Sequence, residues 1–304
     1  MIKKRKPPIP DWLAETQQSQ SAQLEVEYDP LPPRRRRKGW RTFAFLVIIL
    51  AVYLFFPTQD TILVLGIDRA FENTAIGRSD TNILLSVRPL PGTISILSIP
   101  RDLWVTIPNY GENRINTAHY FGEGEQTGNG PRLAVTTVEE NFDIRVDRYV
   151  RIQLEKFPLV VDAMGGVELQ LDTAMAGYPA GTHLLNGTQA LAFVRDRAGT
   201  DDFFRMAQGQ VFLSSFLRTL LKPATWLKAP NIFIAMVETI DTDIPLWQMP
   251  RLIVTAVRSF LFEKIEFIIL QREMVNPWVT PAGAMVLLPD WPKIQPVIQA
   301  EFGR

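Results

Sequence analysis

The chain of 304 residues contains no cysteine and only two histidines, His119 and His183. The absence of cysteine excludes disulfide frameworks, zinc ribbons, iron–sulfur clusters and thiol catalysis. Two histidines are too few for a three-histidine metal site, and each is predicted to be a surface or core residue rather than a ligand. A divalent-metal site in this chain would therefore need carboxylate and water ligands, which suit Mg²⁺ or Ca²⁺ rather than Zn²⁺.

The chain also lacks an excess of charge of either sign, because 32 basic residues balance 32 acidic ones. This balance argues against a purely electrostatic nucleic-acid binder. The charges are unevenly placed, however. Residues 1–41 carry ten Lys/Arg and five Asp/Glu, whereas residues 42–304 carry 22 and 27. A basic excess confined to the N-terminus is typical of a membrane topology signal.

Residues 1–38 are predicted to form a disordered cytoplasmic tail, because prolines are frequent and no apolar periodicity provides a core. Residues 39–57 are predicted to form one transmembrane helix. The run from Phe43 to Phe56 has no charged side chain, and nineteen residues at about 1.5 Å each cover roughly the hydrocarbon thickness of a bilayer.

Two alternatives for this apolar run fit less well. A buried core helix of this length would have a polar face, and a cleaved signal peptide would have a shorter leader and a small-residue cleavage site. The basic cluster Arg34–Lys38 predicts that the N-terminus is cytoplasmic, so that residues 58–304 form an extracytoplasmic domain attached to the cell membrane by a single span.

Residues after this span alternate between strand-like and helix-like patterns, which indicates an α/β fold. Asn186, with Gln189 three residues later, predicts that a short helix begins here with Asn186 as its N-cap. Residues 222–304 are predicted to complete the sheet and its helical cover. The predicted strands are Thr61–Ile67, Thr81–Val87, Thr93–Ile99, Arg148–Leu154, Val167–Leu171 and Lys264–Leu270. The predicted helices include Pro131–Phe142, Phe204–Leu221, Ala229–Thr239 and Leu246–Phe262.

Arginines and aspartates gather where the predicted strands begin or end, and ligands of α/β proteins bind at such sheet edges. Paired arginines suit phosphate, and paired aspartates suit Mg²⁺. Taken singly, Asp68 is also typical of a turn or helix N-cap, and an Arg-x-Arg motif of a solvated face. The groups are Gly66-Ile67-Asp68-Arg69, Arg78-Ser79-Asp80-Thr81, Pro100-Arg101-Asp102, and Arg195-Asp196-Arg197 followed by Asp201, Asp202 and Arg205.

Taken together and in order, these motifs resemble those of the LytR–CpsA–Psr family. The resemblance covers about residues 61–221 as the motif core. The series that carries it is Leu65-Gly66-Ile67-Asp68, Arg78-Ser79-Asp80-Thr81, Leu97-Ser98-Ile99-Pro100-Arg101-Asp102, Arg114-Ile115-Asn116-Thr117-Ala118, Val160-Val161-Asp162-Ala163-Met164-Gly165-Gly166-Val167 and Phe193-Val194-Arg195-Asp196-Arg197.

The resemblance implies a membrane-anchored phosphotransferase of the bacterial cell envelope. Such a protein moves a glycopolymer from a polyprenyl diphosphate carrier to a peptidoglycan hydroxyl, uses Mg²⁺, and folds as a central mixed β-sheet flanked by helices. The implied partners are therefore the polyprenyl diphosphate-linked glycopolymer, the peptidoglycan acceptor and the lipid bilayer, with no nucleic acid.

The resemblance also implies a role for each matching residue. Asp68 and Asp80 match the aspartates that contact the metal, and Asp202 matches an acidic residue that orients the arginines. We expect Arg101 and Arg205 to take part in catalysis, and Asp102 is one candidate among several aspartates for the base that receives the hydroxyl proton. The diphosphate-binding arginines match Arg78, Arg101, Arg195, Arg197 and Arg205.

The chain departs from the family pattern at three positions. Gln208 stands where the family usually has a second arginine, Gly209 where it has a glutamine, and Ala198 where a histidine is common. These changes leave an altered substrate, reduced activity and no activity all open. Gly209 also weakens its helix by about 1 kcal/mol relative to alanine.

Two other functions therefore stay open. One is a degenerate family member that binds the lipid carrier or the wall without transfer, which Gln208 and Gly209 favour. The other is an envelope-linked transcriptional attenuator, which would require the basic tail to bind nucleic acid. The tail has no helix-turn-helix pattern, and anionic lipid headgroups explain its basic cluster better.

Overall fold

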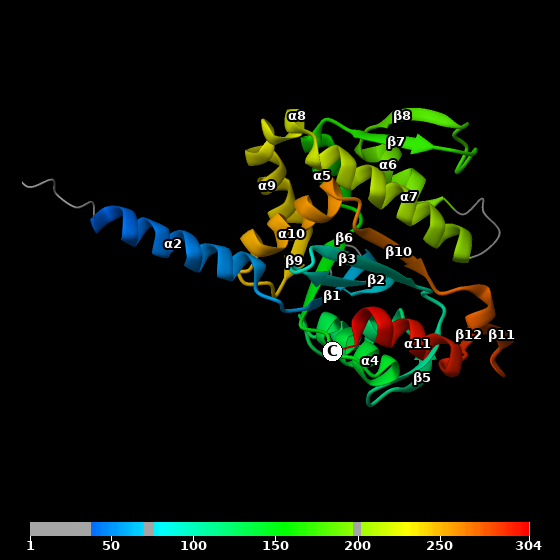
Figure 1. Cartoon of the computed structure of the whole chain (residues 1–304). Helices are drawn as coiled ribbons and strands as arrows, with labels where there is room; N and C mark the ends of the chain where they lie inside the picture. The colour runs from blue at the N-terminus through cyan, green and yellow to red at the C-terminus, as the bar shows by residue number, and fades with distance from the viewer. Residues whose placement is uncertain (1–37, 70–75, 197–201, 304) are drawn as a thin grey trace, which may run out of the picture. The chain divides into compact units, whose positions relative to one another are not determined.

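The computed structural model describes residues 38–69, 76–196 and 202–303 (Figure 1). The chain forms two compact units, residues 1–48 and 49–304. Helix α2 (Lys38–Phe55) begins in the first unit and ends in the second, and most of its apolar side chains are exposed. Within the described ranges, no helix combines the length and the apolar character that a membrane crossing requires. The predicted disordered tail lies outside the described residues except for Lys38.

The second unit contains a six-stranded mixed sheet, which confirms the expected central sheet. Its strand order is β10-β3-β2-β1-β6-β9. The β1–β6 and β3–β10 pairs are parallel, and the other neighbouring pairs are antiparallel. The strands are β1 (Asp60–Arg69), β2 (Gly77–Arg88), β3 (Thr93–Ile99), β6 (Arg148–Gln153), β9 (Ile240–Thr242) and β10 (Ile265–Ile269).

Helices cover both faces of the sheet, because consecutive residues of its central strands are apolar and must all be buried. Ile62 and Leu63 of β1 point to opposite faces, yet both are buried. Figure 1 shows α4 and α11 on one side of the sheet and α7 and α10 on the other. The covering helices are α3 (Thr117–Glu125), α4 (Gly130–Phe142), α7 (Asp202–Leu221), α10 (Met249–Leu261) and α11 (Trp291–Phe302).

A second apolar core lies beneath α7, where Phe212 packs against Val161 and Phe193. The predicted cap of α6 is confirmed, since Gln189 N donates to Asn186 Oδ1 at 2.9 Å and Asn186 N donates to Gln189 Oε1 at 3.0 Å. The elements around this core are α5 (Phe157–Met164), β7 (Val167–Leu171), β8 (Gly181–Leu185), α6 (Gly187–Arg195), α8 (Pro223–Trp226) and α9 (Ala229–Thr239). Two further hairpins are formed by β4 (Trp104–Ile107) with β5 (Gly111–Arg114) and by β11 (Val275–Val279) with β12 (Met285–Pro289).

The C-terminal region completes the fold as predicted. Strands β9 and β10 are the two edges of the sheet, and α10 and α11 cover its opposite faces. The sequence prediction was wrong about where β1 ends and where β2 begins, however. Asp68 lies inside β1 rather than after it, and Arg78, Ser79 and Asp80 lie inside β2 rather than before it.

Candidate active site

Asp80 owes its position to a β-bulge between β1 and β2. Gly66 pairs with Thr81 and Ile67 pairs with Ser79, so Asp80 is the extra residue without a partner on β1. Consecutive side chains of a regular strand point to opposite faces, whereas a bulge redirects one of them. Asp80 and Thr81 consequently line the same pocket.

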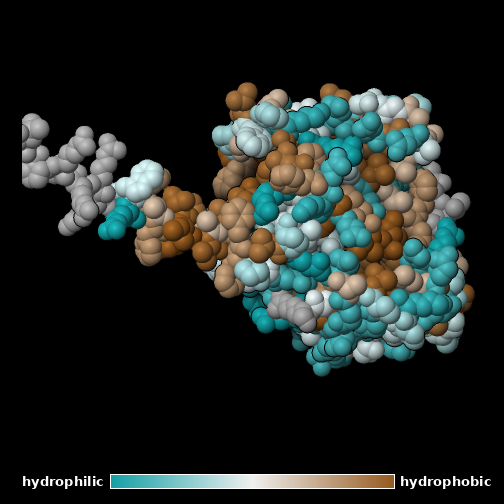
Figure 2. Space-filling model, viewed as in Figure 1, coloured by the Kyte–Doolittle hydropathy of each residue, from teal (hydrophilic) through white to brown (hydrophobic). Residues whose placement is uncertain are grey.

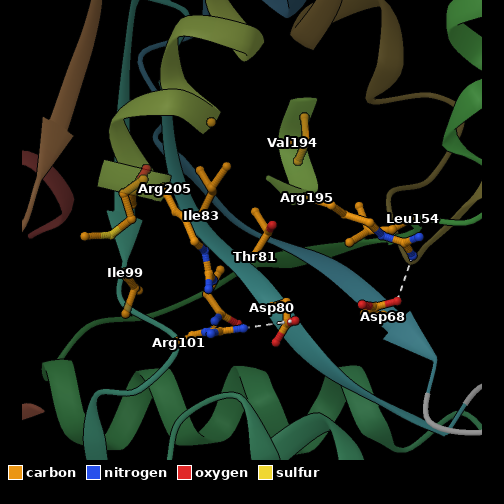
Figure 3. Close-up of a pocket in the computed structure, with 14 residues that line it drawn as sticks. Asp68, Asp80, Thr81, Ile83, Ile99, Arg101, Leu154, Val194, Arg195 and Arg205 are labelled. Atoms are coloured by element: carbon orange, nitrogen blue, oxygen red, sulfur yellow. Dashed lines mark hydrogen bonds and ion pairs between the residues drawn. The ribbon is translucent and has the colours of Figure 1, made fainter. Parts of the chain in front are cut away.

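That pocket has a volume of ≈ 320 Å³ and collects residues from six elements or their ends (Figure 3). The predicted residues among them are Asp68 near the end of β1, Asp80 in β2, Arg101 just after β3, Arg195 at the end of α6 and Arg205 near the start of α7. Its apolar lining includes Ile83, Ile99, Leu154, Val194 and Met206. The pocket therefore presents charged and apolar surfaces side by side.

Each predicted metal-binding aspartate forms an ion pair with an arginine of the same pocket. Arg195 Nη2 lies 2.7 Å from Asp68 Oδ1, and Arg101 Nη1 lies 3.2 Å from Asp80 Oδ2. Figure 3 shows the two pairs as dashed lines. The Asp80–Arg101 pair is the more sheltered, with both side chains 22% exposed, whereas those of Arg195 and Asp68 are 38% and 36% exposed. These groups remain accessible to an anionic ligand that would compete for the guanidinium groups.

Gly66 makes the close approach of the two strands possible. A Cβ atom at this position would lie 2.9 Å from Thr81 Cβ and 3.4 Å from Leu154 Cδ2. Real Cβ atoms do not approach another carbon at 2.9 Å, so any larger residue would push β1 away from the bulged part of β2. The glycine of the Leu65-Gly66-Ile67-Asp68 motif thus allows β1 and β2 to lie close together beside the pocket.

Asp102 lies between two arginines and does not line the pocket. Its Oδ1 atom is 3.0 Å from Arg114 Nε, and its Oδ2 atom is 3.5 Å from Arg101 Nε. Arg114 also donates to the carbonyl of Met285 at 2.9 Å. This arrangement suits a residue that fixes Arg101 better than a base that receives a proton. Arg114 was part of a recognised motif, but no role was predicted for it.

Three other predicted site residues are not seen in this pocket, and the side chains of two of them are not described by the structure. Arg78 is exposed in β2, opposite Asp68 in the strand register, and it is absent from the pocket lining. Arg197 lies outside the described residues. Asp202 is the first residue of α7, and its side chain is also outside the described part of the chain.

The two residues of α7 that depart from the family pattern have different surroundings. Gln208 is 1% exposed and donates from Nε2 to the carbonyl of Phe193 in the core, so its side chain does not line the pocket. Gly209 does line the pocket, and a Cβ atom there would meet no other atom within 4 Å. Of these two residues, only Gly209 therefore lies at the pocket.

The segment Arg114–His119 holds the strand ends that carry the site. Ser79 N donates to Asn116 O at 3.2 Å, and Asn116 N donates to Arg101 O at 3.3 Å. His119 Nδ1 contacts the carbonyl of Gly77 at 2.9 Å, and the ring is fully buried as a core residue. Burial is the main reason that the pKa of His119 is lowered from 6.5, so the ring is neutral and Nδ1 donates. The histidine was predicted to be structural, but its contact next to the site was not predictable from spacing.

The comparison with protein families gives a match to the LytR_cpsA_psr family over residues 58–299. The chain belongs to this family. The match extends well beyond the motif core and includes the C-terminal elements that complete the sheet. The mixed sheet, its helical layers and the ordered motifs thus agree with the resemblance seen in the sequence.

Named relatives of the family are similar to this chain over part of their length. The polyisoprenyl-teichoic acid–peptidoglycan teichoic acid transferase TagU of Oceanobacillus iheyensis is 34% identical over 198 residues, which are 63% of this chain and 61% of that protein. The corresponding TagT of Bacillus subtilis is 34% identical over 180 residues, 54% of each chain. The chain thus matches somewhat over half the length of these relatives.

Solved structures share the fold. The structure of TagT bound to LI-WTA has a TM-score of 0.64 and 26% sequence identity, covering 81% of this chain and 91% of that one. The crystal structure of Bacillus subtilis TagV has a TM-score of 0.65 and 23% identity, covering 81% and 98%. This chain therefore shares its fold with these solved structures over most of its length.

The donor set fits Mg²⁺ in its chemistry. Magnesium is usually bound by one or two carboxylates together with waters and substrate phosphates. Asp68 and Asp80 supply two partly exposed carboxylates to one pocket. Within the described residues there is no cluster of three or more His, Cys, Asp or Glu suited to a metal, so any metal here would need ligands from water or substrate.

Proposed function

We propose that this chain is a phosphotransferase that moves a glycopolymer from a polyprenyl diphosphate carrier to a peptidoglycan hydroxyl. The observation that carries the proposal is the pocket itself. It combines two carboxylates, three guanidinium groups and an apolar wall. A diphosphate joined to an apolar chain has the matching pattern of charged and apolar surface.

The proposed reaction places the negative charge of the diphosphate against Arg101, Arg195 and Arg205. The acceptor hydroxyl oxygen forms a bond to the phosphorus that carries the glycopolymer, and the bond from that phosphorus to the bridging oxygen breaks. Polyprenyl monophosphate leaves, and the proton of the acceptor hydroxyl passes to water. Phosphoryl transfer depends mainly on positioning and on neutralising charge, which planar guanidinium groups provide.

Magnesium is part of this proposal. Asp68 and Asp80 would hold the ion, which when bound would neutralise phosphate charge in the pocket. The arginines that pair with these aspartates can bind phosphate oxygens when the aspartates bind the ion. The proposal requires no further protein carboxylate, because Mg²⁺ usually retains several waters.

The names of the relatives support the substrate class. TagU of Oceanobacillus iheyensis and TagT of Bacillus subtilis are both described as polyisoprenyl-teichoic acid–peptidoglycan teichoic acid transferases. We extend to this chain the class of an isoprenoid-linked polymer and a peptidoglycan acceptor. The particular polymer is left open, because Gly209 opens the pocket at a position where the family usually carries glutamine.

We also propose that the chain is attached to the cell membrane through residues 39–57, with the N-terminus cytoplasmic and residues 58–304 extracytoplasmic. The exposed apolar side chains of α2 support this attachment, as do Trp40 at its start and the preceding basic cluster. Membrane attachment would bring the pocket to the surface that holds polyprenyl lipids.

Binding without transfer is the second candidate, and Gly209 is the observation that favours it. A transfer assay separates the two functions. The full chain in detergent would be incubated with polyprenyl diphosphate-linked glycopolymer, peptidoglycan and Mg²⁺. Polymer attached to peptidoglycan, together with polyprenyl monophosphate, supports the transferase. Lipid bound in a 1:1 complex without either product would show that the chain only binds its carrier.

The arginine contribution can be tested by lipid binding alone. We expect Arg195→Ala to weaken polyprenyl diphosphate binding by about tenfold to a hundredfold, on the order of one or two charge-assisted hydrogen bonds. Arg132, an exposed arginine of α4, provides the matched control as Arg132→Ala. Equal affinities of Arg195→Ala and the unaltered chain in equilibrium binding would contradict the assignment of this residue to the diphosphate.

A further inference from the structure

Helix α10 has an unusual distribution of polar and apolar residues. It buries Arg251, Thr255 and Ser259, which lie one helical turn apart. Ile253 and Leu261 of the same helix are 60% and 67% exposed. Arg251 is held inside by Asp60 and by the hydroxyl of Thr58. A surface helix in water normally exposes its charged residues and buries its aliphatic ones, so the outer face of α10 is suited to an apolar neighbour.

The segments beside α10 show the same feature. Helix α9 buries Ile232 and also exposes Phe233, Ile234 and Val237, so it is apolar on both faces. Leu227 and Leu246, in the connections on either side of α9, are 88% and 80% exposed. Loops of soluble proteins rarely present large aliphatic side chains in a group. Figure 2 shows hydrophobic residues over α8–α10, interspersed with hydrophilic ones.

This surface is continuous with the end of α2. Tyr53 donates a hydrogen bond to the carbonyl of Trp247, and the Arg258 guanidinium lies 4.8 Å from the ring centre of Phe55. Leu50 and Val52 of this end are themselves exposed. Any apolar medium that surrounds the end of α2 therefore also reaches the neighbouring helices.

We propose that this surface rests in the boundary between the headgroups and acyl chains of a lipid bilayer. We call it the α8–α10 patch, defined by Trp226, Leu227, Phe233, Leu246, Trp247 and Phe262. The inference rests on the proposed membrane attachment and adds a second contact to it. Tryptophans favour this boundary, and amphipathic elements bury their apolar side chains there.

The contact is apolar rather than electrostatic. Lys228 and Lys264 are exposed near the patch, but so are Glu238 and Glu263, so the surrounding charges offset one another. The patch should therefore bind zwitterionic lipid without requiring anionic headgroups. Such a contact would fix the orientation of the domain above the membrane.

The absence of cysteine allows a direct test with single-cysteine variants of the full chain. Leu227→Cys and Leu246→Cys would carry an environment-sensitive fluorophore in the patch. Met285→Cys is the matched control, because Met285 is 74% exposed but lies on β12, far from α8–α10 in Figure 1. Each labelled chain would be reconstituted into phosphatidylcholine vesicles with and without lipids that carry a nitroxide at the top of the acyl chain.

We expect the vesicles to float with the chain and the nitroxide to quench the fluorophores at positions 227 and 246 at least threefold more than the one at position 285. Flotation with equal quenching at all three positions would overturn the proposed lipid contact of the α8–α10 patch but would agree with membrane attachment through residues 39–57. Failure to float would overturn both. Fluorescence shielded without nitroxide quenching, and restored by dilution with unlabelled chain, would assign the patch to a second copy and contradict the lipid contact.

Discussion

At the scale of single residues, the contacts of Asp102 favour a role in holding arginines over the role of a base. Its two carboxylate oxygens face Arg114 and Arg101, and the side chain lies outside the pocket lining. We therefore expect Asp102→Asn to lower the turnover number by about tenfold or less, because the amide can keep one hydrogen bond to an arginine. A general base contributes typically 10²–10⁴-fold to the rate.

A pH profile separates the two roles of Asp102 more sharply than the rate alone. A positioning residue leaves the acidic limb of the profile in place when it becomes an amide, whereas removal of the base abolishes that limb. Loss of the limb in Asp102→Asn, together with a fall in turnover of a hundredfold or more, would restore Asp102 as the base.

His119 gives a prediction about stability. Burial lowers the pKa of His119 below 6.5 in the folded chain. Below pH 6.5 the unfolded chain binds a proton that the folded chain still excludes, so this group makes the folded state less stable as pH falls. Nearby Arg151 also opposes the charged ring, whereas Glu123 and Asp241 favour it.

The variant His119→Asn retains a donor near the carbonyl of Gly77 but cannot titrate. We expect its free energy of unfolding to fall less steeply between pH 7 and pH 5 than that of the unaltered chain. Urea unfolding at several pH values measures both slopes, and His183 is common to both proteins. Identical slopes would show that the ring at position 119 does not resist protonation.

At the scale of elements, Gly66, which belongs to a family motif, and Gly209, which departs from the family pattern, have opposite surroundings. Gly209 lies in α7 with open space around it, whereas Gly66 lies in β1 against Thr81 and Leu154. We expect Gly209→Ala to raise Tm by about 2–4 °C, from about 1 kcal/mol of helix propensity. Gly66→Ala should instead lower Tm, because its Cβ would lie 2.9 Å from Thr81 Cβ.

Thermal unfolding of the two variants side by side checks this contrast. Each adds the same methyl group, so the difference reports the local packing and not the composition. A decrease in Tm for Gly209→Ala would contradict the open space around Gly209. An unchanged Tm for Gly66→Ala would contradict the close contact between β1 and Thr81.

The sequence could predict five of the six strands of the central sheet, but not the bulge that builds the site. β-Branched runs identified β1 and β2, because a central strand buried on both faces is continuously apolar. Their polar ends, with Asp68 and Asp80, were read as loops since charged residues are depleted in strands. The bulge at Asp80 depends on the pairing of two strands, which no local pattern specifies.

At the scale of the whole molecule, the ordered motifs predicted that Asp68, Asp80, Arg101, Arg195 and Arg205 belong to one site. The structure brings all five to one pocket from separate elements. The sequence alone could not predict which side chains of α7 face the pocket. Gln208 and Gly209 are neighbours in α7, yet only Gly209 lines the pocket, because Gln208 donates to the carbonyl of Phe193 in α6.

The central claim is that this pocket performs metal-dependent phosphoryl transfer. The most direct measurement follows release of polyprenyl monophosphate by the full chain as Mg²⁺ is titrated, with Asp80→Asn as the test variant. Asp172→Asn, at an exposed aspartate after β7, is the matched control. We expect saturable Mg²⁺-dependent release that Asp80→Asn lowers by about a hundredfold or more and Asp172→Asn leaves intact. Release that is independent of Mg²⁺, or equal in the two variants, would contradict metal-dependent transfer in this pocket.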